Sequence, residues 1–290
     1  MIPPRFEYLT PTTLDETVSL LHSYGPDAKV LAGGQSLIPL MKLRLANPTH
    51  IVDINRVPGL AYIREEDGFL HIGSLTREVD LEGSELIRTK YPIILDTTVV
   101  IADPLVRNLA TVGGNLAHGD PANDHPATML ALGAEIAIMG TGGERTVPVS
   151  DFFQGPLTTV LNHDQVLTEI RVPIPPAGSG GAYLKLERKV GDFATAGVAI
   201  MVVMRGRVCQ QAGIGLTNVG PTPIKARSAE SFLRGKRLDE ETIRQAAQLA
   251  AQESQPSPDL RGPEDYKRDM VRVLAVRALR LALARATQGR

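Results

Sequence analysis

Residues 29–45 read Lys-Val-Leu-Ala-Gly-Gly-Gln-Ser-Leu-Ile-Pro-Leu-Met-Lys-Leu-Arg-Leu and change character at a Gly-Gly dipeptide. The apolar run before the glycines predicts a short strand, and the apolar residues after them recur at helical spacing. Pro39 is compatible with this helix because it lies in the first turn, and we expect Pro48 to end the helix. The turn Ala32-Gly33-Gly34-Gln35-Ser36, hereafter the first glycine loop, is therefore predicted to join a strand to a helix.

The first glycine loop has the chemistry of an anion site. Backbone N–H groups bind a diphosphate well where nothing larger than hydrogen projects from the α-carbon. A turn that opens a helix adds unpaired amides and the positive end of the helix dipole. Ser36 is expected to donate its hydroxyl to a ligand or to cap the helix. The loop is neither G-x-G-x-x-G nor a P-loop, which disfavours nicotinamide binding of the Rossmann type and nucleotide hydrolysis.

A second Gly-Gly dipeptide lies in Thr111-Val112-Gly113-Gly114-Asn115, hereafter the second glycine loop. Residues 118–125, His-Gly-Asp-Pro-Ala-Asn-Asp-His, extend it into a long polar, turn-rich stretch, and such loops are often functional. Either dipeptide alone is explained more often by tight-turn geometry than by a ligand. Two anion-competent loops far apart in the sequence, however, predict one ligand held from two sides.

The polar stretch after the second glycine loop allows two further interpretations. His118, Asp120, Asp124 and His125 include metal-ligand types, but they lack the H-x-x-x-H or H-E-x-x-H spacing of helical metal sites, so we expect no metal. Asp124 is expected to cap a helix that ends at Gly133, and it can contact a ligand as well. Helix capping and ligand contact are therefore both possible roles of Asp124.

Composition limits the classes of function. The chain has 290 residues, 43% of them hydrophobic and 22% charged, which is typical of a soluble protein. With 31 basic and 32 acidic residues, its net charge of -1 offers no basic field for nucleic acid or an anionic membrane. Cys209 is the only cysteine, so the chain alone can hold neither a disulfide nor an iron–sulfur cluster. Redox chemistry would need an organic cofactor.

No apolar stretch reaches the roughly 18 residues of a membrane helix, and the N-terminus does not resemble a signal peptide. The sequence therefore predicts a cytoplasmic protein without a membrane span.

The first part of the chain alternates between helices and strands. A capping box at Thr13 and Glu16 predicts a helix that ends at Gly25. One further helix is expected over residues 85–98, and strands are expected at residues 50–54, 62–64, 69–72 and 134–139, the second and third of which pair across a turn.

A Pro/Gly-rich connector at residues 172–181 predicts a domain boundary near residue 177. Three strand-like runs follow, and two helices close the chain, one beginning near Asp239 and one covering about residues 263–286. The second domain is therefore predicted to be a small antiparallel sheet backed by helices.

Several separated motifs, in order, closely resemble one family. They cover residues 31–42, 101–104, 111–115, 119–124, 183–192 and 215–219. The sequence resembles the FAD-binding medium subunits of the xanthine dehydrogenase and aerobic carbon monoxide dehydrogenase family, the molybdenum hydroxylases. The resemblance spans nearly the whole chain. It implies an α+β fold in which a PCMH-type FAD-binding domain (residues 1–177, subdomains about 1–57 and 58–177) precedes a C-terminal domain of the carbon monoxide dehydrogenase flavoprotein type (residues 178–290).

The resemblance also implies FAD as the cofactor and assigns its contacts. The two glycine loops would hold the diphosphate and ribityl groups, and Asp124 would contact the adenosine side. Ile101 would pack beside the flavin ring. Lys185 would approach the polar edge of the ring, where a cation favours reduced, anionic flavin, although a solvated strand residue is a reasonable alternative for it. The full set of expected contacts is Ala32, Gly33, Gly34, Gln35, Ser36, Ile101, Thr111, Val112, Gly113, Gly114, Asn115, Asp124, Lys185 and Phe193.

Two positions depart from the carbon monoxide dehydrogenase pattern. Gln35 stands where those subunits typically have His, and Phe193 stands where they have Tyr. Phe193 can shield a flavin face but cannot form a hydrogen bond. Carbon monoxide is therefore one candidate substrate beside purines, aldehydes and N-heterocycles.

In the family that the sequence resembles, a large subunit binds molybdopterin and oxidises the substrate, and a small subunit carries two [2Fe–2S] clusters. The medium subunit passes the electrons through FAD to an external acceptor. We therefore expect a dimer of heterotrimers, and no catalytic residue in this chain. The alternative is a self-sufficient flavin oxidase of the related fold, which often has a covalent flavin link; His118 is near the second glycine loop, but the chain offers no large substrate domain. A non-enzymic nucleotide-binding or regulatory protein is a third possibility.

Overall fold

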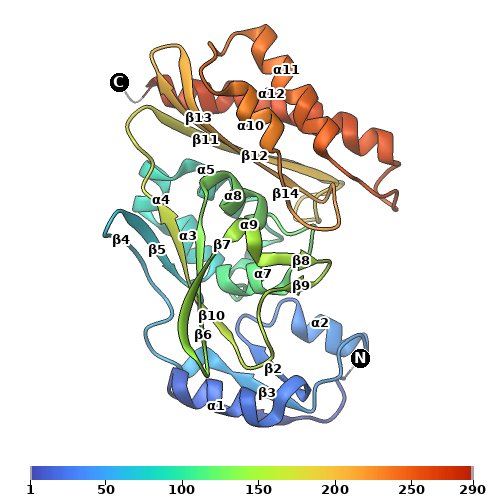
Figure 1. Ribbon diagram of the computed structural model, residues 1–290. Helices are drawn as coiled ribbons and strands as arrows, with labels where there is room; N and C mark the ends of the chain where they lie inside the picture. Colours follow the sequence, from blue (N-terminus) through green and yellow to red (C-terminus); the bar gives the residue numbers. More distant parts are fainter. Residues whose placement is uncertain (1, 289–290) are drawn as a thin grey trace.

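The computed structural model describes residues 2–288, which form three layers stacked from the N-terminal to the C-terminal end (Figure 1). A three-stranded sheet lies at one end, a five-stranded sheet with short helices lies in the middle, and a four-stranded sheet with long helices forms the other end. Each layer contributes its own cluster of buried apolar side chains. The expected α+β architecture is confirmed.

The first layer is a parallel sheet of order β1-β3-β2. Its elements are β1 (Glu7–Leu9), α1 (Leu14–Tyr24), η1 (Gly25–Asp27), β2 (Ala28–Leu31), α2 (Leu37–Lys42), β3 (His50–Asp53) and η2 (Ile54–Arg56). The hydroxyl of Thr13 accepts a hydrogen bond from the Glu16 N–H at 3.1 Å, and Gly25 ends α1 with a φ of 58°, as the sequence predicted. The expectation that α2 continues to Pro48 is wrong, because the chain turns at Arg44 with a φ of 64°.

The middle layer contains an antiparallel sheet of order β4-β5-β10-β6-β7. Its strands are β4 (Ile63–Glu66), β5 (Phe69–Gly73), β6 (Glu135–Gly140), β7 (Gly143–Pro148) and β10 (Val166–Pro173). The predicted β4–β5 hairpin is confirmed, with Asp67 and Gly68 both at positive φ in its turn. The central strand, β10, comes from a segment to which the sequence assigned no element.

The helices of this layer are short: α3 (Glu78–Gly83), α4 (Glu85–Lys90), α5 (Pro92–Thr98), α6 (Pro104–Arg107), α7 (Val112–His118), α8 (His125–Leu132) and α9 (Val149–Phe152); β8 (Phe153–Gly155) and β9 (Thr158–Thr159) form a small hairpin. The single helix expected over residues 85–98 is wrong. Pro92 disfavours the helical conformation at Tyr91, which adopts φ -127° and ψ 53° and separates α4 from α5.

The last layer is an antiparallel sheet of β11 (Ser179–Leu186), β12 (Ala196–Arg205), β13 (Val208–Thr217) and β14 (Ile224–Lys225), followed by α10 (Arg227–Leu233), α11 (Glu240–Glu253) and α12 (Glu264–Gln288). The predicted sheet backed by helices is confirmed, with α10 as an additional helix. The long helix α12 covers one face of the sheet, and α5 and α8 of the middle layer cover the other (Figure 1).

The middle and last layers are in close contact. A side chain on Gly215 of β13 would overlap the carbonyl group of Ala127 in α8. Arg285 of α12 also reaches across to pair with Asp96 of α5. The middle layer is thereby held against the last sheet, where Asp124 at the start of α8 meets Tyr183 and Lys185 of β11. No helix within residues 2–288 is both long and apolar enough to cross a membrane.

Candidate cofactor-binding site

A cavity of about 770 Å³ lies where the three layers meet. Both glycine loops line it, together with Ile101, Asp124 and Phe193. Of the residues expected to contact FAD, all line this cavity except Val112 and Lys185. Segments far apart in the sequence thus form one site, as the pairing of the two loops predicted.

The first glycine loop presents free backbone donors to the cavity. Within residues 2–288, the N–H groups of Gly34, Gln35 and Ser36 have no hydrogen-bond partner. Gly34 has a φ of 72°, which L-residues with a side chain rarely adopt. Ser36 occupies the N-cap position of α2 but makes no capping bond with its side chain, so its hydroxyl is also available. This arrangement fits the predicted anion site.

The second glycine loop differs from the expected polar turn, because it forms the first turn of α7. Thr111 is the N-cap, and its hydroxyl accepts a hydrogen bond from the Gly114 N–H at 3.1 Å. The N–H groups of Val112, Gly113 and Asn115 donate to the carbonyl groups of Thr76, Ser74 and Thr111 at 2.9–3.0 Å. The loop therefore offers a surface without side chains rather than unpaired amides.

The first glycine loop packs against the residues that precede the second loop, and two polar side chains bridge the same segments. A side chain on Gly33 would overlap the carbonyl group of Leu109, just before the second loop. Asn55 donates from Nδ2 to the carbonyl of Ala32 at 2.8 Å, and Arg77 donates to Asn55 Oδ1 at 2.5 Å and to the Leu109 carbonyl. Neither Asn55 nor Arg77 stood out in the sequence, since both act through contacts between distant segments.

Two buried oxygen atoms beside the loops lack partners. Ser74 Oγ and Asn115 Oδ1 have no hydrogen bond to any residue in the described part of the chain, although both residues line the cavity. Buried polar atoms are normally hydrogen-bonded. The free amides of the first glycine loop and the Ser36 hydroxyl suit a ligand rich in phosphate groups, so the residues present fit FAD.

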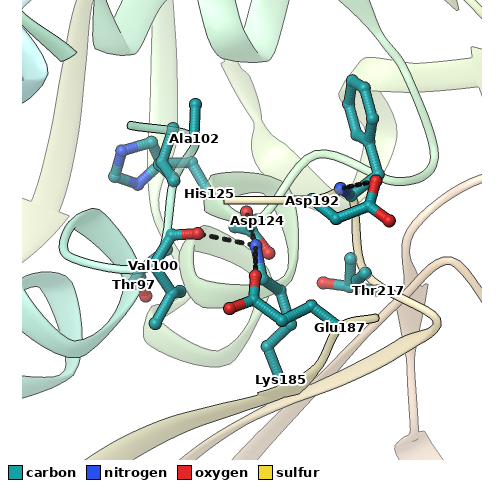
Figure 2. Close-up of polar contacts among 12 residues, drawn as sticks. Thr97, Val100, Ala102, Asp124, His125, Lys185, Glu187, Asp192 and Thr217 are labelled. Atoms are coloured by element: carbon teal, nitrogen blue, oxygen red, sulfur yellow. Dashed lines mark hydrogen bonds and ion pairs between the residues drawn. The ribbon is translucent and has the colours of Figure 1, made fainter. Parts of the chain in front are cut away.

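A cluster of charged side chains stands beside the cavity, between α8 and β11 (Figure 2). The Lys185 ammonium donates to the Val100 carbonyl at 2.7 Å and to Asp124 Oδ2 at 3.0 Å, and it lies 3.4 Å from Glu187 Oε2. Tyr183 donates its hydroxyl to Asp124 Oδ1 at 2.5 Å. Only 1% of the Lys185 side chain is exposed, so the alternative of a solvated strand residue is wrong.

This cluster corrects two expectations about Asp124. The residue occupies the N-cap position of α8, but its side chain makes no capping bond; its two carboxylate oxygens accept from Tyr183 and Lys185 instead. An extended FAD separates its adenosine and flavin ends by the diphosphate and ribityl groups. Since Asp124 and Lys185 are in contact, they cannot serve opposite ends of such a ligand. Burial raises the pKa of the Asp124 carboxyl, although Lys185 and Tyr183 act in the opposite direction.

The environment of Lys185 also differs from the expected cation at the flavin edge. Its side chain does not line the cavity. The ammonium stands between two carboxylates, Asp124 and Glu187, so the cluster as a whole carries no excess positive charge. The Lys185 ammonium contacts Asp124, which lines the cavity.

Ile101 and Phe193 border the cavity from two segments that touch each other. Gly191, with a φ of 79°, fits against Ala102, and a Cβ there would lie 2.6 Å from the Ala102 carbonyl oxygen. Asp192 holds this segment by ion pairs with Arg188 and Arg261 at 2.9 and 2.8 Å. Hydrogen bonds from Arg261 and Arg188 lower the pKa of Asp192 to about 2.

Phe193 itself is 49% exposed and lies where it can cover a ligand.

Sequence reasoning missed one wall of the cavity. Most residues of the segment 157–167, which carries no recognisable motif, line it together with Ala28 and Val30 of β2.

The candidate metal ligands do not meet at one point. His125 is fully buried and pairs with Glu78 at 2.7 Å, Asp124 is held by Lys185, and His118 lies 4.0 Å from Asp120. Within residues 2–288 no three side chains of metal-ligand type gather at one point.

Two family profiles together match almost the whole chain. A profile described as "FAD binding domain in molybdopterin dehydrogenase" matches residues 4–175, and one described as "CO dehydrogenase flavoprotein C-terminal domain" matches residues 181–282. The chain belongs to the FAD-binding subunits of the molybdenum hydroxylases. The expected family, fold and cofactor are confirmed.

Proteins of this family are similar to the chain over nearly its whole length. The carbon monoxide dehydrogenase medium chain of Hydrogenophaga pseudoflava is 47% identical over 98% of this chain and 99% of its own length. A carbon monoxide dehydrogenase structure from that organism, which lacks the Mo-pyranopterin moiety, matches with a TM-score of 0.96 at 48% identity and covers 98% of this chain and 99% of its own. Quinoline 2-oxidoreductase from Pseudomonas putida 86 matches with a TM-score of 0.93 at 33% identity, with 99% of both chains covered.

Proposed function

We propose that this FAD-binding subunit works by electron transfer: it takes electrons from [2Fe–2S] clusters on a small partner subunit and passes them through FAD to an external acceptor. The observation that supports this role is the single cavity in which both glycine loops, Ile101, Asp124 and Phe193 meet in a chain of this family. The chain has one cysteine and therefore cannot hold the clusters itself.

The cavity suggests a division of labour along the cofactor. The free amides of the first glycine loop and the Ser36 hydroxyl receive the diphosphate, and the glycine surface of the second loop lets it approach closely. Ile101 and Phe193 flank the flavin ring. Residues 157–167 receive the adenosine end. FAD supplies the redox chemistry, while the residues of this chain bind it, orient it and set its electrostatic surroundings.

We further propose that the assembly is of the carbon monoxide dehydrogenase type. The identity of 47% to a carbon monoxide dehydrogenase medium chain supports this substrate. The substrate is oxidised on the molybdopterin subunit, and a quinoline oxidoreductase shares this fold at 33% identity, so residues outside this chain select it. A dimer of heterotrimers in the cytoplasm completes the proposal, and the domain ranges 1–177 and 178–290 belong to it as well.

Purification of the native complex tests the proposed role. We expect flavin absorption, iron and molybdenum in a preparation with two further subunits, and reduction of an artificial acceptor when carbon monoxide is added. If quinoline or an aldehyde, and not carbon monoxide, reduced the acceptor, only the proposed substrate would change and the electron-transfer role would stand. A complex with all three subunits but without flavin would contradict the electron-transfer role.

A further inference from the structure

We propose that Arg107 is a positioning residue for the cofactor: its guanidinium holds the turn of residues 100–103 in a strained shape, and this turn sets the gap between Ile101 and Phe193. The inference rests on the proposed function, since it takes the flavin ring to occupy that gap. Arg107 itself does not line the cavity. Its proposed role is therefore to position other residues rather than to contact the ligand.

Arg107 is the last residue of the short helix α6, and only 8% of its surface is exposed. Its guanidinium reaches back to the residues that precede this helix. Nη1 donates to the carbonyl of Ile101 at 3.0 Å and to that of Ala102 at 3.4 Å. Nε donates to Glu82 Oε2 of α3 at 2.9 Å. A cation of fixed planar geometry thus joins the turn to a neighbouring helix.

The backbone of Ala102 shows why the turn requires an anchor. Its φ of 46° lies in the left-handed region, which residues with a side chain rarely adopt. Such a conformation persists only where the surrounding structure holds it in place. Within residues 2–288, no donor other than Arg107 reaches the carbonyl groups of Ile101 and Ala102. Lys185 anchors the preceding carbonyl, that of Val100. Arg107 is therefore the polar anchor of the two turn residues that line the cavity.

The Ala102 carbonyl also sets the place of Phe193. Gly191 packs against this carbonyl so closely that a Cβ on Gly191 would lie 2.6 Å from its oxygen. Two residues further along the chain, Phe193 lines the same cavity as Ile101. A shift of the Ala102 carbonyl therefore displaces the segment that carries Phe193 as well as the backbone of Ile101. By holding this carbonyl, Arg107 keeps both sides of the gap at a fixed separation.

The test uses the assembled enzyme with its partner subunits and compares Arg107→Met with the double variant Arg107→Met/Ala102→Gly. In Arg107→Met the turn loses two hydrogen bonds and should relax. FAD should then dissociate on the order of tenfold more readily, and the visible absorption band of the bound flavin should lose its resolved shoulders. Glycine adopts a positive φ without strain. The double variant should therefore regain most of the FAD retention and the band shape, although the cation is still missing. This rescue separates positioning from charge.

Two results would overturn the inference. The first is an assembled Arg107→Met enzyme with the FAD dissociation rate and the flavin spectrum of the unaltered enzyme. The second is a double variant in which Ala102→Gly restores the melting temperature but not FAD retention, because the role of Arg107 would then be structural alone. Arg107→Lys keeps the charge but not the planar geometry, so it should show the same changes to a smaller extent. If Arg107→Met does not assemble, the same rescue by Ala102→Gly is measured on Arg107→Lys.

Arg285→Met provides the matched control. Arg285 likewise joins a carboxylate, Asp96, to a backbone carbonyl, that of Gly181, and none of these residues lines the cavity. This variant should lower the melting temperature of the complex without changing FAD dissociation. Equal loss of FAD from Arg285→Met and Arg107→Met would contradict a specific role of Arg107. An unaltered complex with all three subunits but without flavin would instead refute the proposed function.

Discussion

The two glycine loops are similar in sequence but use their backbones differently. In the first loop, the N–H groups of Gly34, Gln35 and Ser36 remain free toward the cavity within the described chain. In the second loop, the four N–H groups from Val112 to Asn115 are all bonded inside the protein. One loop therefore keeps backbone donors free for a ligand, and the other forms a backbone surface without side chains beside the same cavity.

The difference originates in the acceptors that the chain places around each loop. The carbonyl groups of Ser74, Thr76 and Thr111 and the Thr111 hydroxyl accept from the second loop, whereas no group in the described chain accepts from the N–H groups of Gly34, Gln35 and Ser36. A helix start that is left unsatisfied by the chain keeps its donors for a ligand. In this chain, N–H groups left without an acceptor are thus a better indicator of an anion site than a Gly-Gly dipeptide.

Gly113→Val should give the largest effect, because this glycine builds the second loop. A Cβ here would lie 2.5 Å from the Ser74 Cβ and 2.6 Å from the Ser74 carbonyl oxygen. Overpacking of this kind costs about 1–3 kcal/mol or more, and here it also breaks the backbone bond to Ser74. We expect a clearly lower melting temperature of the FAD-free protein. Gly142→Val is the matched control, since nothing lies within 4 Å of its Cβ position; equal melting of both variants would contradict the packing role.

Gly114→Val should abolish FAD retention while the fold persists. Its Cβ would meet only a side chain, the Thr111 hydroxyl oxygen at 2.7 Å, so the structural cost is the disturbed cap, about 0.5–2 kcal/mol. The added side chain covers the surface left open for the cofactor. Flavin content per folded chain and the far-UV circular dichroism spectrum measure the two effects separately. A folded variant with normal flavin content would show that the second loop does not contact FAD.

Ser36→Ala should weaken FAD binding by about tenfold to hundredfold, because a hydrogen bond to a charged phosphate contributes roughly 1.5–3 kcal/mol. The stability of the FAD-free protein should not change, since the Ser36 side chain caps nothing. Fluorescence titration with FAD, together with melting of the FAD-free protein, checks both statements. A loss of stability without a loss of affinity would mean that Ser36 supports the fold and does not bind FAD.

The sequence predicted the elements whose signals are local. Thr13, Gly25 and the Asp67-Gly68 turn specify their helix and hairpin through neighbouring residues, and the structure has them in place. Strand β10 was missed because its position at the centre of the sheet depends on pairing with β5 and β6, which lie far away in the chain. Periodicity within one segment contains no information about such partners.

The candidate site also depends on contacts between segments that are far apart in the sequence. The glycine loops could be found from their composition, but helix α7 could not, because glycine disfavours helices and the carbonyl groups that bind its first turn belong to Ser74 and Thr76. The bridge from Asn55 to Arg77 and the contact of Asp124 with Lys185 likewise join distant segments. Resemblance to a family predicted the cofactor contacts, whereas the hydrogen bonds between distant segments could be seen only in the structure.

Thr111→Ala should have the smallest effect on FAD affinity and stability, and it tests most directly whether the two glycine loops have different roles. Thr111 and Ser36 are hydroxyl residues at the N-cap of short helices beside one cavity, so their alanine variants differ little in chemistry. Because Thr111 caps α7, its removal should lower the stability of the FAD-free protein by about 1 kcal/mol. The freed Gly114 N–H then becomes available to FAD, so affinity should fall much less than in Ser36→Ala. Chemical denaturation and FAD titration of both variants in parallel measure this contrast. If the two variants lost stability and affinity in the same proportion, the two loops would play equivalent roles, and the distinction drawn from their hydrogen bonds would be wrong.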